Sequence, residues 1–263
     1  MIIVSASTLL SFLAACQAPK APFHFLENEA LDRIAKIDRI DVIRKSPTFP
    51  IKTNWGVIEG KQADPKSVRA YIPLFVREWS LLPPSLIAKA KLKKVVFCED
   101  LSFAGQRRNA VPDWENDVLY YDVSSVGHRA RYLAAVIHHE FFHLVDYRDD
   151  GLVYEDEPWA ALNPMGFKYG SGGKNAQNDK STTAFSDKFP GFLTHYGATG
   201  VEEDKAELFA HLVVNAAHVK TRAKDDAVLR AKIARLKKLL ADFCPDVDDA
   251  FWTKAEKIDR PAM

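Results

Sequence analysis

The sequence has 263 residues, of which 47% are hydrophobic and 27% are charged, which is the balance of an ordinary globular protein. The length suits one domain, with or without an appended helical segment. Lys and Arg number 36 against 35 acidic residues, so no strong electric field of either sign is expected. This balance argues against a nucleic-acid-binding protein and against charge-driven binding to an anionic membrane surface.

The N-terminus predicts an export signal. Residues 2–15 are mostly apolar, too few to span a bilayer comfortably but enough for the core of a secretion signal. The run Leu13-Ala14-Ala15-Cys16 resembles a bacterial lipobox, although no Lys or Arg precedes it. We therefore expect a signal peptide at 1–15, a tether at 16–26 after a lipidated Cys16, and an exported protein on the periplasmic or surface side of the outer membrane. The alternative is an apolar N-terminal helix or strand with a buried cysteine.

Two further cysteines, Cys98 and Cys244, leave two alternatives open. In an exported protein they could form a disulfide, but the sequence does not show whether they are close enough. Unpaired buried thiols are the other alternative.

The first half of the chain predicts helices followed by strands. In chain order we expect a helix over 27–45, turns with a short strand over 46–60, a helix from Asp64-Pro65 that ends before Pro83-Pro84, a strand at 94–97, a polar loop at 99–116 and a strand at 117–123.

The second half predicts helices around a long polar loop. We expect a helix over 126–146, a loop over 148–190 with a flexible Gly/Ser/Asn-rich part at 170–178, and helices over 201–219, 224–243 and 246–258. The order of helices, a small sheet and more helices predicts an α+β domain over 27–263.

The helix over 126–146 carries the motif H-E-x-x-H, formed by His139, Glu140 and His143. Residues four apart lie on one face of a helix, so both imidazoles could reach one metal ion, while Glu140 could contact a water on that ion. The alternative is a pair of surface or hydrogen-bonded histidines on a core helix. For His138 we expect a structural role, and Asp146 could either support His143 or cap the helix end.

A catalytic zinc of this kind needs a third protein ligand, and the helix over 201–219 offers one. Glu203 and Glu207 are four residues apart and share a face with small alanines. We expect Glu203 to bind the metal and Glu207 to accept a hydrogen bond from a ligand histidine. Glu155 and Glu157 are rival ligands in a loop, and acids at a helix start can also simply compensate the helix dipole.

Two blocks of sequence resemble the catalytic domain of anthrax lethal factor and the related Pro-Pro endopeptidases, which are gluzincins. The first is His139-Glu140-Phe141-x-His143-x-Val145-Asp146, and the second runs from Leu193-Thr194-x-Tyr196-Gly197 through Glu203 to Glu207 and Phe209. The resemblance implies a zincin-like fold, one catalytic Zn2+ held by His139, His143 and Glu203, and Glu140 as general base. It also implies that Tyr196 stabilises the transition state and that Glu203, not Glu202, is the ligand.

The function expected from these residues is a zinc-dependent endopeptidase acting on a peptide or protein substrate. The strand at 117–123 could form the rim of the cleft and pair with substrate, or it could be an ordinary internal strand. Two other functions remain open: a zinc amidohydrolase that acts on non-protein amides, and a non-catalytic surface lipoprotein with a degenerate site.

Overall fold

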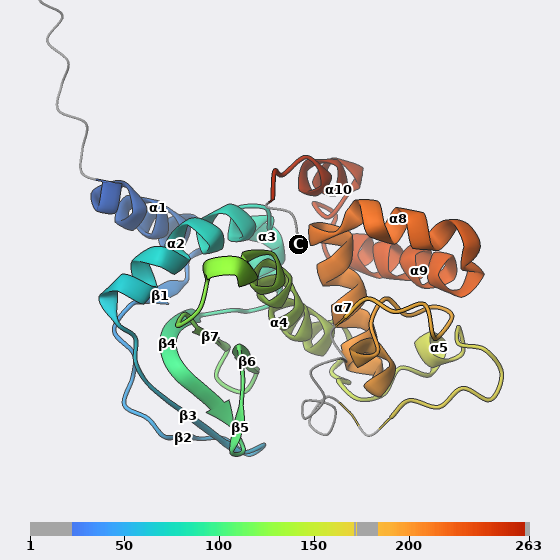
Figure 1. Ribbon diagram of the computed structural model, residues 1–263, viewed down its shortest axis with the longest axis horizontal. Helices are drawn as coiled ribbons and strands as arrows, with labels where there is room; N and C mark the ends of the chain where they lie inside the picture. The colour runs from blue at the N-terminus through green and yellow to red at the C-terminus, as the bar shows by residue number, and fades with distance from the viewer. Residues whose placement is uncertain (1–22, 171, 173–183, 261–263) are drawn as a thin grey trace, which may run out of the picture.

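The computed structural model describes residues 23–170, 172 and 184–260. In these ranges a mixed sheet and a set of helices form the fold, and helix α4 lies between the sheet and the C-terminal helices (Figure 1). The predicted α+β class is confirmed. The predicted signal peptide, Cys16 and most of the Gly-rich loop lie outside the described residues. None of the described helices is long and apolar enough to cross a membrane.

The sheet is built around two parallel central strands. Its strands are β1 (Asp41–Ile43), β2 (Ile51–Lys52), β3 (Val57–Gln62), β4 (Lys94–Phe103), β5 (Gln106–Arg107), β6 (Ala110–Asp113) and β7 (Val118–Asp122). The main path is β2-β3-β4-β7-β6, while β1 and β5 also pair with β4. β4 and β7 run parallel, and β6 closes this side as an antiparallel edge strand.

Alternation along the strands divides the apolar residues between two cores, since successive side chains point to opposite faces. Val95 and Leu119 belong to the large core that the helices cover. Val96 and Tyr120 belong to a smaller core on the other face, where Phe49 packs against them. The sheet is therefore covered on both faces.

The helices carry the site and its supports. They are α1 (Phe23–Asp38), α2 (Pro65–Trp79), α3 (Pro84–Lys89), α4 (Ala130–Asp150), α5 (Glu157–Ala160), α7 (Val201–Val214), α8 (Ala216–Asp225), α9 (Ala227–Phe243) and α10 (Asp249–Glu256), with 3-10 turns η1 (Gly127–Arg129) and η2 (Tyr196–Thr199). α2 begins as predicted, with the Asp64 carboxylate accepting a hydrogen bond from the Lys66 N–H at 2.7 Å. α4 ends at Gly151, whose positive φ of 81° is the left-handed conformation that glycine adopts without strain.

Several predicted boundaries are wrong, and tertiary contacts explain them. The predicted tether ends inside α1, which begins at Phe23, and the predicted helix over 27–45 stops at Asp38 because Asp41–Ile43 pairs with β4. The predicted loop over 99–116 instead contains the end of β4 together with β5 and β6. β5 and β6 are too short to show a pattern of their own and are held by their neighbours in the sheet.

Helix breaks and buried strands supply the remaining differences. The predicted helix over 201–219 divides at Asn215, whose side chain is hydrogen-bonded to Arg131 on α4 and to His211. β7 is fully buried between β4 and β6, so the strand predicted at 117–123 is internal and not the rim of a cleft. Cys98 and Cys244 are free and buried, which settles the two alternatives in favour of unpaired thiols.

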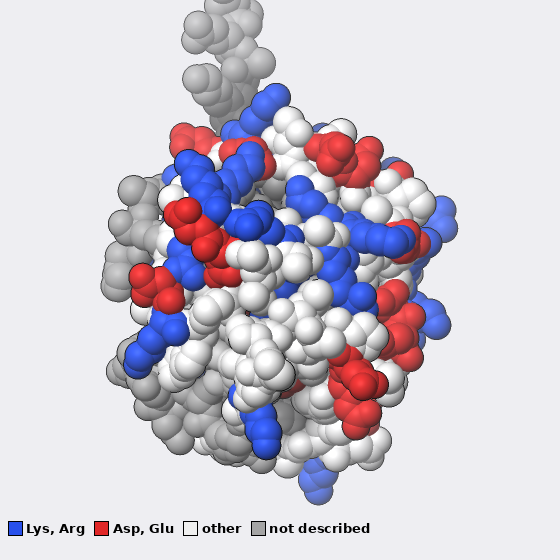
Figure 2. Space-filling view, turned by 90° about the vertical axis from the view of Figure 1, so that its right-hand side faces the viewer, with Lys and Arg blue, Asp and Glu red and all other residues white. Residues whose placement is uncertain are grey.

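Surface charge follows the balance of the composition. On the face that carries α8 and α9, basic and acidic side chains lie among one another, with the basic ones more frequent across its upper half (Figure 2). No single-sign field covers this face.

Candidate metal centre

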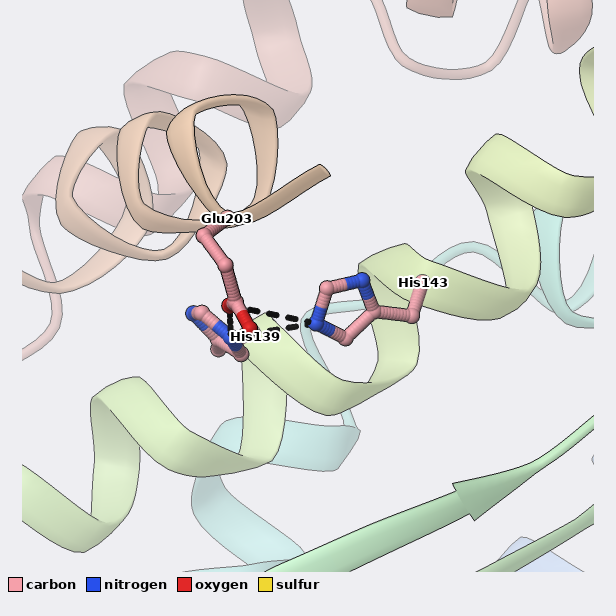
Figure 3. A group of neighbouring side chains, drawn as sticks. All are labelled: His139, His143 and Glu203. Carbon is pink, nitrogen blue, oxygen red and sulfur yellow. Dashed lines mark hydrogen bonds and ion pairs between the residues drawn. The ribbon is translucent and has the colours of Figure 1, made fainter. Parts of the chain in front are cut away.

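The three predicted ligands meet at one point between α4 and α7. His139 and His143 lie one turn apart on α4, and Glu203 reaches them from the first turn of α7 (Figure 3). The Nε2 atoms of the two histidines are 3.1 Å apart, and Glu203 Oε2 lies 3.0 Å from His139 Nε2 and 3.6 Å from His143 Nε2. All three residues are buried.

These distances fit a tetrahedral zinc. Bonds of ~2.0–2.1 Å to zinc place the ligand atoms of a tetrahedral site about 3.3 Å from one another. Two imidazole nitrogens and one carboxylate oxygen are also a donor set that leaves a fourth position for water or substrate. The residues present therefore fit one zinc ion.

Glu207 orients His139 as predicted. His139 Nδ1 donates to Glu207 Oε1 at 3.1 Å, and in a neutral ring this leaves the Nε2 lone pair free to bind a metal. Thr194 Oγ1 donates to the other oxygen of Glu207 at 2.6 Å and accepts from the Gly197 N–H at 3.1 Å. Thr194 thereby links α7 to η2, the turn in which Tyr196 lies.

The electrostatics of the cluster favour a positive charge at its centre. Burial alone would lower the pKa of His139, but hydrogen bonds and the charges of Glu203 and Glu207 raise it well above its usual value. Burial raises the pKa of Glu203, but the hydrogen bonds and charges of His139 and His143 outweigh the effect of burial, so the pKa of Glu203 is lowered. Two carboxylates around His139 thus create a place for a cation.

Glu140 and Tyr196 line the same cavity, whose volume is about 510 Å³. The Tyr196 hydroxyl donates to Glu203 Oε1 at 2.8 Å. Burial raises the pKa of Glu140, and burial together with the charges of Glu203 and Glu140 raises that of Tyr196 well above its usual value. The structure therefore brings all five predicted site residues to one cavity, and the roles assigned to them stay predictions.

The rival ligands lie elsewhere. Glu155 and Glu157 are exposed and outside the cluster. Glu202 is buried beside Glu203 and faces the cavity, but it is not part of the three-residue cluster. A Cβ at Gly200 would lie 2.4 Å from Glu202 Oε1, so the close approach of this carboxylate requires glycine there.

Asp146 takes neither of its two expected roles. Its carboxylate binds Lys205 Nζ at 2.7 Å, and α4 continues four residues beyond it. Burial raises the pKa of Asp146 to about 6, against the opposing charge of Lys205. His143 Nδ1 has no hydrogen-bond partner in the part of the chain that the structure describes. Glu207 is therefore the carboxylate that supports a ligand histidine.

His138 has the structural role that we expected. Its Nε2 donates to Glu78 Oε2 at 3.1 Å, and Arg260 donates to the same oxygen at 2.8 Å. Burial lowers the pKa of His138. Burial raises the pKa of Glu78, but the hydrogen bonds from His138 and Arg260 outweigh this and hold the pKa of Glu78 below its ordinary value. The sequence signal for this network was Glu78 itself, an acid within the apolar stripe of α2.

A group of three aromatic residues at the cavity was not predicted from the sequence. Trp55 lies 6.0 Å from Trp114 and 6.4 Å from Tyr154 between ring centroids, and all three line the cavity. Trp55 and Tyr154 are each more than half exposed. They come from segments far apart in the sequence and show no shared pattern along the chain.

No protein-family model matches the sequence, and no curated protein matches it. The fold is similar to the crystal structure of a protein from Bacteroides caccae that is proposed to be a zinc-binding metallo-peptidase. The two chains are 16% identical and superpose with a TM-score of 0.50, over 89% of this chain and 95% of that chain. This chain therefore shares the α+β fold of that protein and has a candidate metal site at His139, His143 and Glu203.

Proposed function

We propose that this protein is a zinc-dependent endopeptidase of the H-E-x-x-H gluzincin type, similar to the lethal factor and Pro-Pro endopeptidase family. The observation that carries the proposal is the convergence of His139, His143 and Glu203 on one point, in a cavity that Glu140 and Tyr196 also line. The fold is consistent with it. A bound zinc would acidify its water ligand and polarise the scissile carbonyl.

Each side chain has a role in peptide hydrolysis. His139, His143 and Glu203 hold the metal, and Glu207 keeps the His139 Nε2 lone pair directed at it. Glu140 removes a proton from the attacking water and later delivers it to the departing amine nitrogen. The Tyr196 hydroxyl donates to Glu203 in the structure and would donate instead to the oxyanion that develops on the carbonyl.

Zinc content and proteolysis test the proposal together. Purified protein should bind about one zinc per chain, and so should Glu202→Ala, whereas Glu203→Ala should bind little. The zinc-loaded protein should cleave an unstructured protein substrate, and Glu140→Gln should keep zinc but lose most of this activity. Glu157→Gln, a change at an exposed acid outside the cavity, is the matched control and should behave as wild type.

Three outcomes would overturn parts of the scheme. An active Glu140→Gln enzyme would remove Glu140 as the base. Absence of zinc from the wild-type protein after metal reconstitution would favour a non-catalytic binding protein. Zinc binding without proteolysis, but with hydrolysis of cell-wall amides, would favour the zinc amidohydrolase.

We also propose that the protein is exported and held at a bacterial membrane by a lipid on Cys16, which follows the lipobox-like sequence Leu13-Ala14-Ala15-Cys16. Mass spectrometry of the protein purified from bacterial membranes should show a lipidated N-terminal residue 16, and Cys16→Ser should release the protein from the membrane fraction. A mature protein that begins at residue 2 would contradict this proposal.

A further inference from the structure

Glu202 is a buried carboxylate that the proposed mechanism does not use. It is 6% exposed and lines the cavity beside the candidate metal centre. Its neighbours on α7 all have partners: Glu203 contacts His139, Asp204 binds Lys232, and Glu207 accepts from Thr194. Across residues 23–170, 172 and 184–260, no Lys, Arg or His forms an ion pair with Glu202.

A role in helix capping does not account for this carboxylate. Glu202 lies in the first turn of α7. An acid near a helix N-terminus gains only a small stabilisation from the dipole. Removing an ion from water costs more than this, so the dipole alone does not offset the burial of Glu202. A buried polar group without a partner needs an explanation, and one that lies in a cleft is a candidate for ligand binding.

The surroundings of Glu202 suit a cation. The Glu202 carboxylate packs against Gly200 and Gly172, which add no side chain at this part of the cavity. Burial raises the pKa of the Tyr154 hydroxyl, and the nearby charges of Glu202 and Glu203 raise it further. The exposed rings of Tyr154 and Trp55 lie against each other at the same cavity, and aromatic faces attract ammonium and guanidinium groups.

Among the residues that the structure describes, Arg108 is the one Lys or Arg that lines this cavity, and it makes no ion pair with Glu202. The Arg108 guanidinium donates to Gln106 Oε1 at 3.1 Å. The side of the cavity formed by Glu202 and Tyr154 is therefore acidic and aromatic.

We propose that Glu202 is a specificity-determining residue that binds a cationic nitrogen of the peptide substrate. That nitrogen belongs either to a Lys or Arg side chain or to a free α-amino group. The proposal rests on the peptide hydrolysis proposed above, and it adds a preference for substrates that carry a positive charge near the scissile bond. A Lys or Arg side chain there is compatible with cleavage inside a chain, whereas a free α-amino group would direct cleavage to bonds near an N-terminus.

Cleavage mapping followed by a binding assay tests this proposal. Cleavage products of a denatured protein mixture, identified by mass spectrometry, should be enriched for a basic residue or a free N-terminus at one position. Peptides that differ there only in arginine or citrulline, and in a free or acetylated N-terminus, are then bound to the zinc-loaded full chain that carries Glu140→Gln. Citrulline keeps the shape of arginine without its charge, so the ratio of the two Kd values isolates the cation.

The charged peptide of the decisive pair should bind about 10- to 100-fold more tightly, which is the range for a hydrogen bond to a charged group. Adding Glu202→Gln should bring this ratio close to one, while adding Glu157→Gln should leave it unchanged. The arginine–citrulline pair and the free–acetylated pair identify which nitrogen is bound. Zinc content and melting temperature of the Glu202→Gln protein show that the site is still assembled.

Two results would overturn the inference, and they can be told apart. If peptides are cleaved and bound but neither pair shows a preference, or Glu202→Gln leaves the preference intact, the role of Glu202 is wrong while the peptidase proposal stands. If the zinc-loaded wild-type protein cleaves and binds no peptide of any kind, the peptidase proposal fails and this inference fails with it.

Discussion

Replacing Glu207 with glutamine tests whether the carboxylate behind His139 controls the metal site. The Glu207 carboxylate accepts from His139 Nδ1 at 3.1 Å and from Thr194 Oγ1 at 2.6 Å, so its position is fixed on both sides. Glutamine has nearly the same shape, and the change removes charge without creating a cavity. The imidazole then loses the negative partner that fixes its tautomer and increases its basicity toward a metal.

The expected loss is about 10- to 100-fold in zinc affinity, the usual effect of removing such a partner. This corresponds to about 1.4–2.7 kcal/mol, at 1.36 kcal/mol for each tenfold change. Competition for zinc against a chromophoric chelator at neutral pH measures the affinity directly. Thermal unfolding of the zinc-free protein separates a loss of affinity from a loss of folded protein.

Two matched variants show whether the effect belongs to Glu207. Glu202→Gln removes a neighbouring carboxylate that does not touch His139, and Asp146→Asn removes one that binds Lys205. Each should lower zinc affinity less than Glu207→Gln does, because neither carboxylate is hydrogen-bonded to His139, His143 or Glu203 and each acts on them only through its charge. Wild-type zinc affinity in Glu207→Gln, or an equal loss in Asp146→Asn, would refute this assignment.

Three further predictions concern other parts of the molecule. Tyr196→Phe should lower kcat by about 10²–10³-fold with a smaller change in KM, and an unchanged kcat in steady-state assays would exclude Tyr196 from the mechanism. Glu78→Gln should lower the free energy of unfolding in urea by about 3–5 kcal/mol, because His138 and Arg260 lose a buried partner. Burial raises the pKa of Glu78, but its two partners outweigh burial and lower this pKa below the ordinary 4.5. The stabilisation that the Glu78 carboxylate gives the folded protein is therefore complete above pH 4.5 and is lost as the pH falls through the pKa of the folded state. Wild-type stability should thus decline in acid more steeply than that of Glu78→Gln, and parallel curves would contradict this. Cys98 and Cys244 should react with a thiol reagent only as the protein unfolds, and rapid reaction of the native protein would contradict their burial.

The spacing of the candidate metal ligands along each helix was predictable because it depends on local periodicity. The separation of four residues places His139 and His143 on one face of a helix whatever surrounds it, and the same argument pairs Glu203 with Glu207 on the second helix. The apolar stripe and the Asp64-Pro65 start likewise predicted α2. These features require no knowledge of which elements meet in space.

The strands around the site were not predictable in this way. β5 and β6 are two and four residues long, and Asp41–Ile43 is a strand only because it pairs with β4. Short strands gain their stability from hydrogen bonds to neighbours that are distant in sequence, so local pattern is a weak guide to them. For this reason the local pattern predicts a loop over 99–116, where the structure has β5 and β6.

The sequence by itself determined the α+β class, the two helices that carry the candidate ligands and the face of the helix on which each candidate ligand lies. Only the tertiary structure decided which carboxylate serves which partner: Glu207 supports His139, Asp146 binds Lys205, and Glu78 holds His138. Only the structure also showed that Glu202 faces the cavity and has no cationic partner among residues 23–170, 172 and 184–260. Helical spacing sets the face on which a side chain lies, whereas the partner that compensates its buried charge comes from another element, and its identity depends on how those elements pack.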